Sequence, residues 1–266
     1  MACFVKDSTN QRPKYYKLQM KRFLAVPLIL IAFSASLAAN TTIAGISGYI
    51  VIPSAEVTPS TIASAVTTSY SATLGSNGAV HIPALQLAFK DTFETSLAVD
   101  IADNTDILLN AKWLFSKKGT TNFAAGLLGQ WSSVSKDDEV AAQIYFASTF
   151  DSSIMDYPSK TTLLVGYSLM KGMNSDINFA LAFQTPLLAK TFKNKVDFLL
   201  DFGNVSYSAT PSAGNAENRG LVNVGIRLLP IEFLKSIFIA VDIRALDLFD
   251  HEGRALSLGA SISFRP

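Results

Sequence analysis

The strongest constraint on the fold is a period-two alternation of apolar and polar residues. Between Ile237 and Ile243 every second residue is Ile or Val, whereas Asp242 and its alternate neighbours form a second, mixed set. Between Leu256 and Phe264 large apolar residues alternate mainly with Ser and Gly. Successive side chains of a strand point to opposite faces, so this pattern predicts two β-strands, each with one apolar face.

The same alternation recurs from Ser60 onward and predicts an all-β fold. The expected strands are about 60–74, 80–90, 93–102, 107–115, 123–131, 140–150, 163–169, 177–183, 196–202, 222–228, 235–246 and 256–264. Even numbers of antiparallel strands about ten residues long are typical of outer-membrane barrels. The sequence therefore predicts an antiparallel transmembrane β-barrel of about 12 strands, with a range of about 10–14.

Composition favours a lipid-facing barrel over a secreted β-sandwich, which also alternates. Only 16% of the residues are charged, against about 25% in soluble domains. The less apolar face holds Gly, Ala, Ser, Asn and Gln, which would make a poor solvent surface for a soluble sheet. Aromatic residues recur at expected strand ends, where interfacial girdles lie. They are Phe93, Trp113, Phe115, Phe123, Trp131, Phe150, Phe183 and Phe264.

Residues 1–38 are expected to be an N-terminal extension and a signal peptide. From Met20, which we expect to be the true start, a basic pair precedes the apolar run Phe23–Phe33. Small residues ending at Ala38 follow, and they predict cleavage after about that position. The apolar run is too short for the alternative, a membrane anchor. The single cysteine, Cys3, lies in the part expected to be removed, so no disulfide or thiolate metal site is expected.

Residues 39–59 form a pre-barrel segment, and residues 60–266 form the expected barrel. The segment contains Gly48, Pro53 and Pro59 around one apolar run, Tyr49–Ile52. Prolines argue against a central strand. The segment is therefore interpreted as a possible lumen plug or a cover of the periplasmic mouth, and a loose periplasmic tail remains an alternative.

Polar residues on the less apolar faces are the candidate lining of the lumen or pore. They are Asp100, Asn110, Lys112, Gln130, Asp197, Asp201, Arg227, Asp242 and Arg244. Buried charges must pair or meet water. These residues therefore form either an ion-pair network that fills the lumen or the lining of a solute-selective pore. The longest expected outer loop, 208–220, is rich in small polar residues and is predicted to be a mobile surface loop.

The sequence predicts no enzyme, no metal site and no cofactor. His81 stands at an expected strand start, and His251 lies beside carboxylates in an expected outer loop. A His–Asp pair can act as a general base or bind a metal, but such loops are commonly solvated turns. The net charge of +1 gives no reason to expect nucleic acid as a partner.

Three stretches carry a resemblance to known barrels. Gly48–Val57, Phe93–Leu97 and Leu109–Trp113 resemble the start and the second hairpin of YjbH-like outer-membrane barrels. The overall pattern is similar to that of treponemal-type small outer-membrane β-barrel proteins. The resemblance covers about a third of the chain, through loose motifs. It implies an outer-membrane barrel, in some members associated with exopolysaccharide export, and no catalytic residues transfer with it.

Together these features predict a protein of the cell outer membrane that forms a pore for passive diffusion of small polar solutes. The alternative is a plugged barrel with a structural, adhesive or envelope-assembly role. A third class, a membrane-embedded hydrolase, would depend on His251. The expected partners are the lipid bilayer of the outer membrane, the barrel-assembly machinery and the small polar solutes.

Overall fold

The computed structural model describes most of the chain after the predicted leader. The described residues are 40–60, 64–76, 78–102, 105–132, 139–154, 156–169, 177–208, 211, 213–216, 219–250 and 253–265. The predicted signal peptide and His251 lie outside the described residues.

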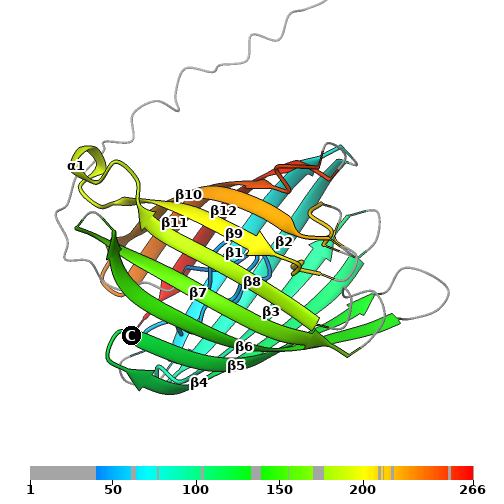
Figure 1. Cartoon of the computed structure of the whole chain (residues 1–266), viewed down its shortest axis with the longest axis horizontal. Helices are drawn as coiled ribbons and strands as arrows, with labels where there is room; N and C mark the ends of the chain where they lie inside the picture. The colour runs from blue at the N-terminus through cyan, green and yellow to red at the C-terminus, as the bar shows by residue number, and fades with distance from the viewer. Residues whose placement is uncertain are drawn as a thin grey trace, which may run out of the picture. The chain divides into compact units, whose positions relative to one another are not determined.

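Twelve antiparallel strands close into one barrel (Figure 1), which confirms the predicted fold class. Each strand pairs with its neighbours in sequence, and β12 pairs with β1 to close the ring. The strands are β1 Ser64–Gly75, β2 Gly78–Phe89, β3 Phe93–Ile101, β4 Thr105–Lys118, β5 Thr121–Ser132, β6 Glu139–Ile154, β7 Tyr157–Ser168, β8 Ile177–Pro186, β9 Val196–Gly203, β10 Leu221–Leu234, β11 Ile237–Leu246 and β12 Ala255–Phe264. Closure leaves no strand edge unpaired, as a hydrocarbon environment requires.

The barrel wall is apolar outside, and its inner face carries polar, charged and small side chains together with some larger apolar ones. In β8 the residues alternate strictly at first, so that Ile177, Phe179 and Leu181 are exposed while Asn178 and Ala180 are buried. The same alternation runs through β2, β3, β11 and β12. A secreted β-sandwich would turn the apolar residues inward, so this arrangement excludes that alternative. The exposed apolar belt on a closed barrel defines a membrane-spanning, outer-membrane-type barrel.

Aromatic rings gather on the outer face around the ends of β2 to β6. Phe89 and Phe93 flank the β2–β3 turn, with ring centroids 6.3 Å apart. The ring centroid of Phe115 lies 5.7 Å from that of Trp113 and 5.7 Å from that of Phe146. Rings of this kind fit the boundary between hydrocarbon and headgroups. They therefore mark one edge of the membrane-embedded belt.

The two ends of the barrel differ in their connections. At the end with the aromatic cluster, short turns join β2 to β3, β4 to β5, β6 to β7 and β10 to β11. At the same end the β8–β9 connection contains the short helix α1, Ala189–Phe192. The other end carries the long β9–β10 connection, which runs from Asn204 to Gly220. Among the described residues, no helix has the length and apolar character needed to cross a bilayer.

Residues 40–60 lie inside the barrel, as the blue trace in Figure 1 shows. All of them except Asn40, Glu56 and Pro59 are buried. They join β1 through residues 61–63, so they enter the lumen from the end with the short turns. We call residues 40–60 the plug.

Replacing Leu181 by arginine tests the lipid-facing belt. Leu181 lies on the outer face in the middle of β8. An arginine near the bilayer midplane costs about 2–4 kcal/mol, and we expect Leu181→Arg to lower the free energy of unfolding from lipid vesicles by that amount. Leu188→Arg, in the β8–β9 connection, is the matched control and should change it little. Equal losses for both variants would contradict a hydrocarbon belt at Leu181.

Candidate functional site

The plug is a compact double turn held by its own backbone. Isolated antiparallel bridges join Thr41 to Ser47 and Gly48 to Pro53. The N–H of Thr42 donates to the carbonyl of Ile46 at 2.7 Å, and the N–H of Gly48 donates to the carbonyl of Asn40 at 2.7 Å. A Cβ atom at Gly48 would lie 2.3 Å from the carbonyl oxygen of Ile52. Only glycine allows this close approach, so Gly48 is essential to the plug's shape.

Apolar plug side chains pack against a wall of small residues. Ile43, Ile50 and Ile52 are at most 1% exposed. They belong to one buried cluster with inward-facing wall residues that include Ala84 and Ala98. Alanines on the inner face leave room for isoleucines from the plug. Each isoleucine fully buried in this way contributes about 1.5–3 kcal/mol.

One anchor of the plug is the carboxylate of Asp201 on β9. Its Oδ2 accepts hydrogen bonds from three successive backbone N–H groups, those of Ile50 at 3.1 Å, Val51 at 2.7 Å and Ile52 at 3.1 Å. Successive N–H groups that converge in this way form a concave anion site. The backbone N–H groups of the plug therefore bind the Asp201 carboxylate of the wall in the way that such sites bind a free anion.

Two arginines hold plug carbonyl groups nearby. Arg227 on β10 donates to the carbonyls of Gly48 at 3.0 Å, Thr41 at 2.9 Å and Tyr49 at 2.8 Å. Arg244 on β11 donates to the carbonyl of Thr41 at 3.2 Å. Both guanidinium groups also contact Oδ2 of Asp242, at 3.1 Å from Arg227 and 2.7 Å from Arg244.

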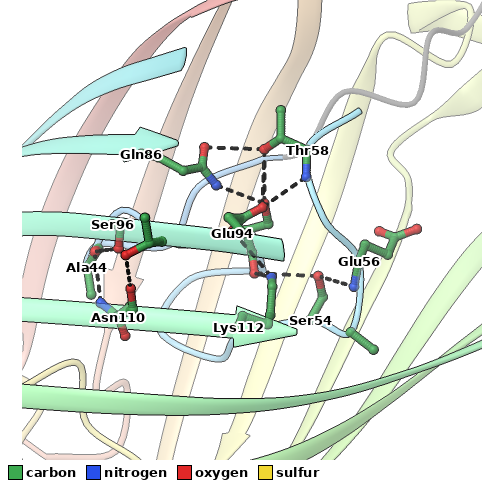
Figure 2. A network of polar contacts seen from close by, with 12 residues as sticks. Ala44, Ser54, Glu56, Thr58, Gln86, Glu94, Ser96, Asn110 and Lys112 are labelled. Atoms are coloured by element: carbon green, nitrogen blue, oxygen red, sulfur yellow. Dashed lines mark hydrogen bonds and ion pairs between the residues drawn. The ribbon is translucent and has the colours of Figure 1, made fainter. Parts of the chain in front are cut away.

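A third anchor lies on β3 and β4, as Figure 2 shows. Glu94 accepts from the Ser47 N–H at 2.6 Å and from the Thr58 N–H at 2.9 Å. Lys112 lies 3.4 Å from Glu94 and donates to the carbonyl of Ser47 at 2.9 Å. Gln86 on β2 donates to the Ser47 hydroxyl at 3.0 Å. The carboxylate and the ammonium group thus bind the N–H and the carbonyl of a single plug residue.

The remaining contacts reach β6 and β7. The hydroxyl of Thr149 accepts from the N–H of Ala55 at 2.8 Å. Tyr49 lies 2.8 Å, hydroxyl to hydroxyl, from Thr162. Burial raises the pKa of Tyr49 far above its ordinary value, so this phenol stays neutral. The plug is therefore fixed to strands around the whole lumen.

The β9–β10 connection closes the other part of the lumen. Ser208, Ala213 and Ala216 are buried, so the prediction of a mobile surface loop is wrong for these residues. Val205 and Tyr207 line a small cavity together with residues of the plug and the wall. Small side chains in a sequence predict mobility, but they also fit a narrow interior. Described residues of this connection therefore lie buried beside the plug and the wall.

The nine candidate lining residues all project inward and are buried. Asn110, Lys112, Asp201, Arg227 and Arg244 contact the plug directly. The other four contact wall or loop residues: Asp242 pairs with the two arginines, Gln130 donates to Asp106, Asp197 accepts from Gln184, and Asp100 interacts with Tyr207. That these residues line a conducting path stays a prediction.

Several wall residues that contact the plug are not among the nine candidate lining residues predicted from the sequence. Glu94 is the clearest case, because it shares the even-numbered face of β3 with Asp100 and is fully buried. Extending the period-two pattern back along that strand would have found it. Thr149 and Thr162 gave no comparable signal, since threonine is ordinary in strands of any kind.

The fold and the lumen together define an outer-membrane-type β-barrel with an internal plug. No protein-family model matches the chain, and no curated protein sequence matches it. Among solved structures, the KdgM porin is similar at 9% identity over 75% of this chain and 99% of that chain, with a TM-score of 0.49. The NanC porin is similar at 10% identity over 76% and 100%, with a TM-score of 0.49. The outer membrane protein Omp33 of Acinetobacter baumannii is similar at 7% identity over 77% and 99%, with a TM-score of 0.43.

Removing the Asp201 carboxylate should loosen the plug. We expect Asp201→Ala to raise the rate at which a water-soluble maleimide labels a thiol introduced as Ala55→Cys, a position that is fully buried. A hydrogen bond to a charged group contributes about 1.5–3 kcal/mol, and about 1.4 kcal/mol is tenfold in an equilibrium. The increase should therefore be at least about tenfold.

Two variants control this experiment. Asp201→Asn keeps an oxygen acceptor and should cause a smaller increase. Asp156→Asn alters an exposed carboxylate in the β6–β7 turn and should cause none. The sequence's only other thiol, Cys3, lies in the predicted leader. A labelling rate that Asp201→Ala leaves unchanged would contradict the role of this carboxylate.

Proposed function

We propose that this protein is an outer-membrane channel for passive diffusion of small polar solutes, and that the plug holds it closed in the state described here. One observation carries the proposal: the wall beneath the plug is lined with charged and amide side chains. Asp201, Glu94, Lys112, Arg227 and Arg244 all bind plug backbone groups. Water can replace a backbone group at each of these contacts, so the same wall is suited to a wet lumen.

The energetics of buried charge support this interpretation. Replacing a buried ion pair by apolar residues of similar volume is often neutral or stabilising. A barrel that needed only a permanent core would gain little from Arg227 and Arg244 at 1% exposure. A role in which these side chains meet water or solute accounts for them directly.

The covalent connections of the plug allow it to leave the lumen. The plug is joined to the barrel through residues 61–63, which precede β1. Removal of the predicted leader after about Ala38 would leave this as its only covalent link. The plug can then withdraw toward the end with the short turns while the strand pairing of the barrel stays unchanged.

A second candidate function is a permanently closed barrel with a structural or adhesive role in the envelope. The wide spread of contacts around the plug favours this closed barrel. The strands that contribute contacts are β2, β3, β4, β6, β7, β9, β10 and β11. The buried β9–β10 connection favours it as well. The two candidates differ in whether a barrel with a disrupted plug conducts ions.

Gly48→Leu is the variant that separates them. The atoms that a Cβ at Gly48 would meet below 3.0 Å belong to Thr42, Ile52 and Pro53, all within the plug. The substitution therefore breaks the plug and leaves the wall intact. In planar bilayers we expect wild-type chains to be largely closed and Gly48→Leu chains to show steady openings.

Gly129→Ala on β5 is the matched control. The nearest heavy atom to a Cβ there would be 3.9 Å away, which is an ordinary contact. This variant should behave as wild type. Gly48→Leu chains that insert into the bilayer and remain silent would overturn the channel proposal and favour the closed structural barrel.

A further inference from the structure

We propose that the lumen, once the plug has left, selects small cations over anions. This inference rests on the proposed channel function and names the class of solute that the lumen favours. It follows from the charges that remain on the wall when the plug is absent. Carboxylate-lined constrictions favour cations, whereas rings of Arg or Lys favour anions.

The described part of the wall carries an excess of carboxylates. Among strand residues with buried side chains, six are acidic and three are basic. The acidic residues are Glu94, Asp100, Asp106, Asp197, Asp201 and Asp242, and the basic residues are Lys112, Arg227 and Arg244. The plug contributes one further carboxylate, that of Glu56, so its departure leaves the excess on the wall unchanged.

The cationic side chains keep acidic neighbours when the plug leaves. Arg227 and Arg244 both contact Asp242, and Lys112 lies 3.4 Å from Glu94. Those carboxylates belong to the wall, so the pairs do not depend on the plug. In the open lumen Lys112 therefore keeps one carboxylate, and the two arginines share the carboxylate of Asp242.

Asp201 loses three hydrogen-bond donors when the plug leaves. In the closed state its Oδ2 is occupied by three N–H groups of Ile50, Val51 and Ile52. All three belong to the plug and depart with it. The anion site on the plug and the carboxylate on the wall separate, and Asp201 then presents its charge to water in the lumen. A cation is the natural replacement partner.

The carboxylates are distributed along the barrel axis. Asp100 and Asp106 are cross-strand partners near the end that carries the long β9–β10 connection. Asp197 lies at the start of β9, near the opposite end, and Asp201 lies between the two ends. Inward-facing carboxylates therefore lie near both ends of the lumen and between them. Low-dielectric walls strengthen the fields of such charges.

At the plug-side mouth, one lysine has a carboxylate neighbour on the wall. Lys160 on β7 pairs with Glu56 of the plug in the closed state. Its Nζ also lies 3.9 Å from a carboxylate oxygen of Asp151 on the neighbouring strand. When Glu56 leaves with the plug, Asp151 remains beside this lysine. This lysine therefore keeps a carboxylate neighbour in the open lumen.

The test measures the zero-current potential of full-length Gly48→Leu channels under a KCl gradient. We expect a potential whose sign shows K⁺ to be several-fold more permeant than Cl⁻. Adding Asp197→Asn and Asp201→Asn to the Gly48→Leu chain should shift the potential toward that of an unselective pore. Adding Asp156→Asn, on the exposed β6–β7 turn, should leave it unchanged.

A chain that lacks residues 40–58 provides a second open variant in case Gly48→Leu does not fold. Conduction with Cl⁻ preferred, or with selectivity unmoved by the Asp197 and Asp201 changes, would overturn cation selection while the channel proposal stands. Silence of both open variants after insertion would overturn the channel proposal, and the selectivity inference with it.

Discussion

The hydrogen bonds between the Asp201 carboxylate and three successive plug N–H groups are the interaction on which the closed lumen depends. Inside the barrel, an unmatched backbone group or charge would cost free energy. Asp201 needs donors and the turn at Ile50–Ile52 needs an acceptor, and each meets the other's requirement. In the same way, Arg227 donates hydrogen bonds to plug carbonyls, and Glu94 accepts hydrogen bonds from further plug N–H groups. The plug therefore fits because its polar backbone matches the charges of the wall.

The two faces of the barrel wall obey opposite requirements. The outer face meets hydrocarbon, so Leu181 and its neighbours must be apolar. The inner face carries many polar and charged side chains, and such groups must contact either water or protein groups that can replace water. The plug and the β9–β10 connection supply those groups in the state described here. The same inner face is therefore compatible with a filled lumen and with a wet one, and this links the closed structure to the proposed channel function.

Much of the fold could be predicted from the sequence because period-two alternation is local. It gave the number of strands, their order and the face to which Asp242 and Arg244 point. The prediction from the sequence is wrong where it depends on amino-acid composition and not on the alternation of side chains. The many small polar residues of the β9–β10 connection predict a mobile surface loop. Its residue Ala216 is fully buried, since small residues also suit a narrow interior. Glu94 escaped the predicted set although it obeys the alternation of its own strand.

By itself the sequence determined a closed antiparallel barrel, its apolar outer face and the inward direction of its charges. These properties depend on side-chain alternation within single strands. Only the tertiary structure decided where residues 40–60 lie, which the sequence left open among a plug, a mouth cover and a loose tail. The reason is distance along the chain: Asp201 and Ile50 are 151 residues apart in sequence. Closure of the ring by β1 and β12 creates the enclosed space in which these groups meet, and no local pattern encodes that contact.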